Sequence, residues 1–421
     1  MYFWYKFFTY LLYPFAPIYL YIRCKRGKED LIRYKEKLSK IKISRENGFL
    51  VWFHVASVGE AMSILPLIEQ CILEKKIDKI LLTSITLSSS KVLNKKYKNN
   101  SKVIHQFLPL DIPIFTNKFI KHWKPNLSIF IDSEIWPNII LQIKDRGIPL
   151  LLINARITKK SFKRWRLVKS FSKKIFSKFD LCIASNKESE NFLNILGAKN
   201  IKNYGNLKYT QLKNGSNYNF DDYLLDKLKG RKIWCAASTH PSEENLCGET
   251  HLKLKKYYQN ILTIIIPRHI NRVEKINSEL SNLNLKVVSL SQINQFSADT
   301  DILIVDSYGE TLKFYNISKY IFVGKSLAKN FIGDSGQNPI EPARFGCKVF
   351  HGPHTSNFSE IYKYLKTLNV TREVKNSDEL SLSLVEEFEK NYVKNHENIE
   401  KIQNYGQNIF NNVIIELKKY I

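Results

Sequence analysis

Residues 49–60 read FLVWFHVASVGE, and this stretch decides the fold class of the chain. An almost continuous apolar run passes into Ala56 and Ser57, and Gly59 and Glu60 follow at once. Strands that are buried on both faces read as such runs, so the stretch predicts a strand of a parallel sheet followed by a helix. Polar residues after such a strand lie at the carboxyl edge of the sheet, where open α/β proteins bind their ligands.

Apolar runs of the same kind recur along the chain in two series. The first series continues at 79–86, 103–110, 127–133, 148–155 and 180–185, and the second occupies 232–238, 260–267, 285–290, 301–306, 320–326 and 347–352. The runs alternate with helical or polar stretches, which predicts βα units around one parallel sheet in each series. A chain of 421 residues also exceeds the size at which one core keeps growing. We therefore expect an α/β fold with two doubly wound, Rossmann-like domains that face a central cleft.

Four parts of the chain follow from this pattern. A hydrophobic amino-terminal segment covers 1–22, the first domain covers 30–210 and the second domain covers 224–380. Residues 381–421 are charged with helically spaced apolar positions, and we expect them to form helices that pack across the domains. The polar stretch 211–223 has no apolar period, which is typical of a linker.

Residues 2–22 are almost wholly aromatic and aliphatic. Bulky aromatics and the lack of a small-residue cleavage pattern argue against a removable signal peptide, so we expect a membrane-anchor helix. Its length approaches the roughly 20 residues that span a bilayer, whereas Lys6, Pro14 and Pro17 weaken a spanning helix. Three arrangements of this segment stay open: it spans the membrane, it lies in the membrane interface, or it packs as a buried helix of a soluble domain. Four basic residues follow the segment and favour a cytoplasmic body and anionic lipid headgroups, namely Arg23, Lys25, Arg26 and Lys28.

The chain is strongly basic, with a formal net charge of +26 from 65 Lys and Arg against 39 Asp and Glu. Such an excess suggests nucleic acid, an anionic membrane surface or an acidic substrate as partner. A compositional bias is the alternative, since Lys, Asn and Ile are abundant everywhere in the sequence. Because the basic residues are spread rather than gathered in a reading motif, we expect no nucleic-acid partner.

Several signatures of other enzyme classes are missing from the sequence. There is no GxxxxGK[ST] and no GxGxxG after the first strand, which argues against a P-loop hydrolase and against a nicotinamide or flavin enzyme. The six cysteines are scattered without a CxxC pair, so neither a zinc site nor a disulfide framework is indicated. No DxD pair stands at a strand end, and we expect neither a metal nor a cofactor.

Two strand ends of the first domain carry carboxylates. Glu60 is a candidate general base. In a reaction that transfers a group such as a sugar to an acceptor hydroxyl, that hydroxyl becomes a good nucleophile only as its proton is removed. The alternative is that its charge stabilises the first turn of a helix. Glu134 and Trp136 suit a carbohydrate site, by hydrogen bonding and by stacking on a sugar face. Alternatively, Trp136 belongs to the core and Pro137 starts a helix.

A basic stretch follows the run at 148–155, and it suits either acceptor phosphates or a solvated helix face. Its members are Arg156, Lys159, Lys160, Lys163 and Arg164. At the turn before Glu60, we expect Gly59 to permit unusual backbone angles. The residues predicted on the acceptor side are Ser57, Gly59, Trp136, Arg156 and Lys160.

Three turns of the second domain favour anions. Residues 238–240 end a strand, and Pro241 suits the first turn of the next helix, with backbone amides that point into the cleft. Arg268 and His269 end another strand and offer a guanidinium and an imidazole to a phosphate. The small-residue loop 333–342 leads into a helix whose amino terminus receives an anion. Each turn is also compatible with an ordinary cap, but together they predict a donor-nucleotide site.

Eleven segments in this order resemble the Kdo transferases of lipopolysaccharide biosynthesis, where Kdo is 3-deoxy-manno-octulosonic acid. They are FHVASVGE, TSITLSSS, SEIWPN, NARIT, GNLKY, AASTHPSEE, PRH, DSYGE, FVGKSL, GQNPIEPA and GPHTSNF, from Phe53 to Phe358. The resemblance implies an inverting glycosyltransferase of GT-B fold that moves Kdo from CMP-Kdo, held by the second domain, to lipid IVA, a tetraacyl lipid A precursor. An acceptor that stays in the bilayer implies work at the cytoplasmic face of the inner membrane, with anionic lipids as partners.

The resemblance also implies roles for individual residues. Glu60 matches the proposed catalytic base of the family, and Glu134 matches a second carboxylate near its active site. The residues expected to bind the donor are Ser238, Thr239, His240, Arg268, His269, Gly309, Glu310, Asn338 and Glu341.

The sequence departs from the family pattern at four positions. The family commonly has Ala at Val55, Gly at Ser335, His at Gln337 and Gly at Lys325, which affects the details of donor contacts. The rival hypotheses are a sugar-nucleotide epimerase or a transferase for another acceptor, neither of which needs the amino-terminal anchor, and a basic nucleic-acid-binding protein.

Overall fold

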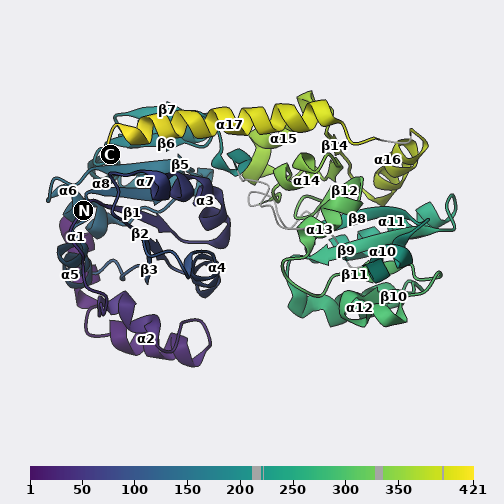
Figure 1. Ribbon diagram of the computed structural model, residues 1–421, viewed down its shortest axis with the longest axis horizontal. Helices are drawn as coiled ribbons and strands as arrows, with labels where there is room; N and C mark the ends of the chain where they lie inside the picture. The colour runs from purple at the N-terminus through teal and green to yellow at the C-terminus, as the bar shows by residue number, and fades with distance from the viewer. Residues whose placement is uncertain (211–219, 221, 328–334, 391–392) are drawn as a thin grey trace. The chain divides into compact units, whose positions relative to one another are not determined.

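The computed structural model describes residues 1–210, 220, 222–327, 335–390 and 393–421. Residues Met1–Leu212 and Tyr405–Ile421 form one compact unit, and Lys213–Asn404 form a second (Figure 1). Most of the predicted linker 211–223 lies outside the described residues.

The first unit is built on a parallel sheet of seven strands in the order β3-β2-β1-β4-β5-β6-β7. The strands are β1 (Leu50–Val55), β2 (Lys79–Ser84), β3 (Val103–Phe107), β4 (Leu127–Ile131), β5 (Leu150–Ala155), β6 (Leu181–Ala184) and β7 (Ile201–Asn203). Central β1 is buried at all six positions, with Leu50 opposite Lys79 of β2 and Val51 opposite Leu127 of β4. Burial on both faces explains its nearly continuous apolar sequence.

Helices follow the strands of the first unit in the expected alternation. They are α3 (Val58–Leu73), α4 (Leu87–Tyr97), α5 (Pro113–Trp123), α6 (Pro137–Lys144), α7 (Lys159–Leu167), α8 (Lys169–Phe176) and α9 (Lys187–Leu196). Several start at capping side chains, because the first N–H groups of a helix have no partner within it. Ser57 caps α3, Thr86 caps α4 and Asn186 caps α9, each by accepting an N–H three residues further on. The core beneath contains Trp52, Trp123 and Phe130, and all three are fully buried.

The second unit repeats this construction with the strand order β10-β11-β9-β8-β12-β13-β14. Its strands are β8 (Lys232–Thr239), β9 (Ile261–Pro267), β10 (Val287–Ser289), β11 (Ile302–Ile304), β12 (Tyr320–Val323), β13 (Lys348–His351) and β14 (Thr371–Glu373). Its helices are α10 (Asp222–Leu228), α11 (Glu243–Lys255), α12 (Val273–Ser281), α13 (Thr311–Ile317), α14 (Ile340–Arg344), α15 (Ser359–Thr367) and α16 (Ser377–Glu389). All strand pairs recorded in both sheets are parallel, which confirms the predicted α/β class with two parallel sheets.

Two edge strands, β7 and β14, were not predicted from the sequence. β7 reads IKN and β14 reads TRE, three residues each. An edge strand has one open side and needs no continuous apolar run, so neither segment carries the pattern by which the other strands are recognised.

The carboxyl-terminal stretch contributes to both units. Leu384 and Phe388 of α16 belong to the core of the second unit. The last helix, α17 (His396–Lys418), begins in the second unit and ends in the first. Its Ile399 reaches Gly346 in the second unit, while Ile409 lies against Gly205 in the first.

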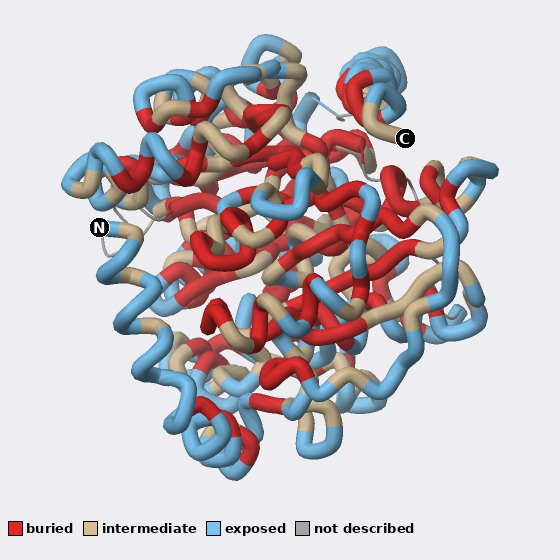
Figure 2. The backbone as a smooth tube through the Cα atoms, turned by 90° about the vertical axis from the view of Figure 1, so that its left-hand side faces the viewer, coloured by how far each residue is buried: buried red, intermediate tan, exposed pale blue. Residues whose placement is uncertain are grey.

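The amino terminus forms two short helices, α1 (Tyr2–Leu11) and α2 (Ala16–Lys25), where a single helix over 1–22 was expected. Among the described residues, no helix combines the length and the apolar character that crossing a membrane requires. The inner face of α1 is pinned by polar contacts, since Tyr5 Oη donates to Asp111 at 2.8 Å and Asn138 Nδ2 donates to Thr9 Oγ1 at 3.1 Å. Figure 2 shows this segment as pale blue along most of its length, so its outer face is exposed.

Candidate active site

The carboxyl ends of three neighbouring strands bring together predicted catalytic and acceptor-side residues of the first unit. Glu60 follows β1, Glu134 follows β4 and Arg156 follows β5, and these strands are adjacent in the order β1-β4-β5. Residues far apart in the sequence therefore meet at one edge of the sheet, as the fold class predicts.

Glu60 lies in the first turn of α3 and is held by the turn before it. Its Oε2 accepts from Ala56 N at 2.7 Å and its Oε1 accepts from Ser57 Oγ at 3.0 Å. These contacts hold Glu60 at the start of the helix, where the alternative expectation placed its charge, but they do not keep the carboxylate acidic. The pKa of Glu60 is raised to about 7. Burial is the largest cause, the charges of Asp132 and Glu134 act in the same direction, and the hydrogen bonds from Ala56 and Ser57 oppose them. A carboxyl group with such a pKa is suited to accept a proton near neutral pH.

The reason expected for Gly59 is wrong. Gly59 lies inside α3 without a positive φ, and a Cβ atom built there meets nothing within 4 Å. Helical angles need no glycine, so its contribution is open space beside the exposed Ser57, at the amino end of the helix.

Glu134 is buried and held from two sides. Its Oε2 lies 3.1 Å from Nε2 of the fully buried His54, and it accepts from Trp136 Nε1 at 2.8 Å. His54 Nδ1 lies 2.9 Å from Thr83 Oγ1 on the adjacent strand. Trp136 caps α6, with Pro137 at its start, and is half-buried against the core. Trp136 is thus not a fully buried core residue, and its indole N–H orients Glu134, while stacking of the ring on a sugar face stays a prediction.

Asp132 was missed by the sequence analysis, although it is the first polar residue after β4. It is buried and adopts a left-handed backbone conformation with φ of 60°. Burial raises its pKa, while the charges of Lys208 and Arg156 lower it. Lys208 belongs to a segment that is distant in the sequence. That segment is held near Asp132 because Asn154, near the end of β5, accepts the N–H of the preceding residue, Leu207, at 2.9 Å. Strained non-glycine backbone of this kind is often found at functional sites.

The structure places members of the basic stretch after β5 in two different environments. Arg156 lies close enough to influence Asp132, and its N–H donates to the Asp132 carbonyl at 3.1 Å. Lys160 instead lies in the first turn of α7, a helix whose single buried residue is Phe162. The exposed position of Lys160 matches a solvated basic face as well as a phosphate contact.

In the second unit, the donor-side residues follow the neighbouring strands β11, β9, β8 and β12. Ser238 and Thr239 end β8, with Ser238 at φ of 56° and Thr239 fully buried. Arg268 and His269 follow β9 and are exposed, and Arg268 N donates to the Thr239 carbonyl at 3.1 Å. That bond joins the two strand ends directly.

The turn after β8 differs from the expectation in two ways. Pro241 does not lie in the first helical turn, because α11 begins at Glu243 with Ser242 as its N-cap. The backbone amide of His240 is not left for a ligand either. The buried carboxylate of Glu243 accepts a hydrogen bond from the His240 amide at 3.0 Å. It also accepts from the N–H groups of Lys325, Ser326 and Leu327 at 2.7 to 3.1 Å.

Cationic side chains surround His240 instead. Its ring lies edge-on to that of His269 with centroids 5.8 Å apart, and its Nε2 lies 3.3 Å from Gln337 Nε2. Burial lowers the pKa of His240 to about 4, helped by the charges of Lys325, His269, Arg268 and Arg272. Arg272 has a structural partner, since its guanidinium donates to both oxygens of the fully buried Glu244 at 2.8 and 3.1 Å.

The remaining predicted donor residues lie on two other turns. Gly309 has φ of 95° before α13, where Glu310 is the N-cap and pairs with Lys313 at 2.8 Å. Asn338 lies just before the short helix α14, whose N-cap is Pro339, and its Oδ1 accepts from Ile340 N at 3.1 Å; Glu341 lies in the first turn. Residues 333 and 334 of the predicted loop lie outside the described residues. In the described ranges, no group of three or more His, Cys, Asp or Glu side chains is arranged to hold a metal ion.

The fold resembles those of two solved enzymes, an epimerase and a glycosyltransferase. The structure of UDP-GlcNAc 2-epimerase from Neisseria meningitidis bound to UDP-GlcNAc matches 88% of this chain and 100% of its own, with a TM-score of 0.58 and 15% identity. A glycosyltransferase from Rickettsia africae ESF-5 matches 89% of this chain and 98% of its own, with a TM-score of 0.53 and 14% identity. At such identities the likeness defines the fold class alone.

Sequence comparison defines the family. The family described as 3-Deoxy-D-manno-octulosonic-acid transferase (kdotransferase) matches residues 28–211. A 3-deoxy-D-manno-octulosonic acid transferase of Rickettsia bellii (strain RML369-C) is 34% identical over 96% of this chain and 93% of its own length. Its counterpart in Haemophilus influenzae (strain ATCC 51907 / DSM 11121 / KW20 / Rd) is 29% identical over 96% and 94%. The chain belongs to the Kdo transferase family and is a glycosyltransferase, as the resemblance predicted.

Proposed function

We propose that this enzyme transfers Kdo from CMP-Kdo to lipid IVA in lipopolysaccharide synthesis, with inversion at the anomeric carbon. Family membership over almost the whole chain supports the sugar and its donor. The observation that carries the mechanism is Glu60, a half-buried carboxyl group at the carboxyl edge of the sheet with a pKa of about 7.

In this mechanism Glu60 is the general base. A hydroxyl of the acceptor attacks the anomeric carbon of Kdo, and its proton passes to the Glu60 carboxylate as the new C–O bond forms. The bond between the anomeric carbon and the phosphate oxygen of CMP breaks, and its electron pair leaves with CMP. Attack on the face opposite the leaving group inverts the configuration. Ala56 and Ser57 hold the carboxylate in place for this step.

The basic side chains of the second unit suit the departing phosphate. Arg268 and His269 are exposed beside the end of β8, and the charge of Lys325 acts on the same region. Positive groups placed in advance stabilise the negative charge that grows on the leaving group. His240 stays neutral near pH 7 because its pKa is about 4, so it contributes hydrogen bonds rather than charge.

The acceptor side and the location form the second part of the proposal. Arg156 and Lys160, with Lys208, offer positive charge to the phosphates of a lipid A headgroup. The exposed aromatic face of α1 and α2 then lies in the interface of the inner membrane at its cytoplasmic face, among anionic lipids. This face includes Phe3, Trp4, Phe7, Phe8, Ile18 and Tyr19, each at least 45% exposed.

A single reaction tests the proposal. Membranes that carry the protein are incubated with CMP-Kdo and lipid IVA, and the lipid products are weighed by mass spectrometry. We expect products heavier than lipid IVA by one or more Kdo residues, with release of CMP. Unchanged lipid IVA alongside free Kdo and CMP would point to hydrolysis, and no consumption of CMP-Kdo would refute the assigned donor.

A further inference from the structure

Two neighbouring aliphatic side chains stand out after α2. Leu31 is 74% exposed and Ile32 is 79% exposed. Their backbone is fixed, because Asp30 Oδ1 accepts from Ile32 N at 2.9 Å and from Arg33 N at 2.8 Å. The two side chains are therefore presented to solvent by an ordered turn, which exposes apolar surface at a cost that a partner would remove.

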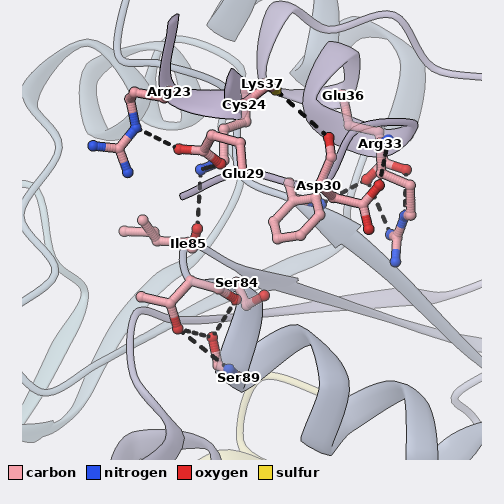
Figure 3. Close-up of polar contacts among 12 residues, drawn as sticks. Arg23, Cys24, Glu29, Asp30, Arg33, Glu36, Lys37, Ser84, Ile85 and Ser89 are labelled. Carbon is pink, nitrogen blue, oxygen red and sulfur yellow. Dashed lines mark hydrogen bonds and ion pairs between the residues drawn. The ribbon is translucent and has the colours of Figure 1, made fainter. Parts of the chain in front are cut away.

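An ionic cluster around the buried Glu29 ties this turn to the body of the first unit (Figure 3). The carboxylate of Glu29 accepts from Arg23 Nε at 2.7 Å and from Lys37 Nζ at 2.6 Å. Lys37 is buried and also donates to the carbonyl of Ile85 at 3.0 Å. Charge-assisted bonds of this kind, shielded from water, hold their partners in one arrangement.

A second set of contacts fixes the other side of the turn. Arg33 donates to both oxygens of Glu36 at 2.8 and 3.0 Å and to the carbonyl of His105 at 2.9 Å. Glu36 in turn accepts the N–H of Phe107, the last residue of β3, at 2.9 Å. The turn is thus bound at the carboxyl ends of β2 and β3.

This is the edge of the sheet that carries Glu60. Ile85 directly follows β2, and Ser89, in the next helix, donates to the Ala56 carbonyl at 3.2 Å. Ala56 is the residue whose N–H holds Glu60. A short series of contacts therefore connects the apolar turn to the proposed base.

The charges around the turn identify its partner. Exposed basic side chains flank Leu31 and Ile32 in the sequence, namely Lys25, Arg26, Lys28 and Lys35. Exposed apolar residues with exposed cations close by in the sequence suit the surface of an anionic bilayer, where the apolar groups enter the acyl region and the cations meet the headgroups.

We propose that Leu31 and Ile32 form a rigid membrane-inserting turn, distinct from α1 and α2, which the Arg23–Glu29–Lys37 cluster holds at a fixed position relative to Glu60. The turn sets the level at which a headgroup in the bilayer meets the proposed base. The inference rests on the proposed lipid acceptor, but insertion itself is tested without any transfer reaction.

The first test uses a fluorescent probe on the full chain. All six native cysteines are buried, so a cysteine introduced by Ile32→Cys is the accessible site for an environment-sensitive NBD label. The matched control is Leu73→Cys, which is equally exposed at the end of α3, where the helix has run back from the Glu60 edge. On adding vesicles of phosphatidylglycerol and phosphatidylethanolamine, we expect a blue shift and a several-fold rise in emission at position 32 and none at position 73.

Two outcomes of this test overturn the inference. The first is an emission at position 32 that responds to vesicles no more than the emission at position 73. The second is a shift that appears with rising protein concentration in the absence of vesicles, because the turn would then bind a second copy of the chain.

The second test removes the apolar groups and leaves α1 and α2 intact. The double variant Leu31→Asn, Ile32→Asn should lower partitioning into anionic vesicles by about tenfold. Its melting temperature should stay that of the wild type, because both side chains are exposed, and Leu73→Asn is the control. Unchanged partitioning of the double variant overturns the inference. Failure of the wild type to transfer Kdo would refute the proposed function and leave these binding results unaffected.

Discussion

The carboxyl edges of the two sheets are alike in backbone and opposite in charge. The first gathers the carboxylates of Glu60, Asp132 and Glu134, whereas the second gathers Arg268, His269 and Lys325 around His240. Burial disfavours the charged form in both places, so it raises the pKa of Glu60 and lowers that of His240. One edge thereby gains a base that works near neutral pH, and the other keeps the cations Arg268 and Lys325 beside the neutral imidazole of His240. The same architecture thus suits proton removal on one side and anion binding on the other.

The largest effect is expected from removing the base. Glu60→Gln keeps the hydrogen-bonding shape but cannot take a proton, so kcat should fall by about a thousandfold. The surface variant Glu188→Gln serves as control, and thermal melting should show that both variants are folded. Turnover of Glu60→Gln within a few-fold of the wild type would remove Glu60 from the mechanism and leave the first edge without an assigned role.

Substitutions of two arginines at the second edge test donor binding and protein stability separately. Arg272→Ala leaves the fully buried Glu244 unpaired and should lower the free energy of unfolding by about 3 kcal/mol in denaturant titration. Arg268→Ala removes an exposed side chain and should leave that free energy unchanged, while KM for CMP-Kdo rises by about tenfold or more. If Arg268→Ala lowered stability and left KM unchanged, the second edge would not be a donor site.

The charge of Asp132 offers a pH test of the first edge. Activity should rise with pH as Glu60 ionises, with the midpoint of this acidic limb near pH 7. Asp132 raises the pKa of Glu60, so Asp132→Asn should move the limb to lower pH. Asn tolerates the left-handed backbone at this position, which keeps the fold intact. Asp226→Asn is the control, and a profile of kcat/KM against pH that does not move would show that the two carboxylates do not interact.

Two glycines should give the smallest effects, of opposite sign. Gly59→Ala adds a methyl group into open space in a helix and should stabilise the protein by about 0.5 kcal/mol. Gly336→Ala meets a φ of 84° and the Cα of Thr355 at 3.0 Å, and should destabilise it by about 1 kcal/mol or more. Denaturant midpoints measure both. A Gly59→Ala variant that is stable but slow would indicate that the acceptor approaches the amino end of α3.

Most of the fold could be predicted, because central strands buried on both faces leave a continuous apolar run. β7 and β14 could not, since these short edge strands read IKN and TRE and carry no apolar run. At the site, Glu60 and Glu134 were found by taking carboxylates at the ends of strands. His54 was missed because it lies within β1, and Glu243 because its partners Lys325 to Leu327 lie more than 80 residues further on.

The sequence by itself determined the α/β class, the strand ends from which functional residues project, and the family. These properties depend on local periodicity and on short motifs read in order. Only the tertiary structure decided which groups are charged and which amides are already occupied. Burial and contacts between distant segments set both, as when Lys208 is brought to Asp132 through Asn154. In the same way, Glu243 binds the amides of Lys325 to Leu327 together with that of His240, which lies in a turn expected to offer amides to a ligand. Free energies of desolvation and pairing exist only in the folded chain, so they are not written in any single stretch of it.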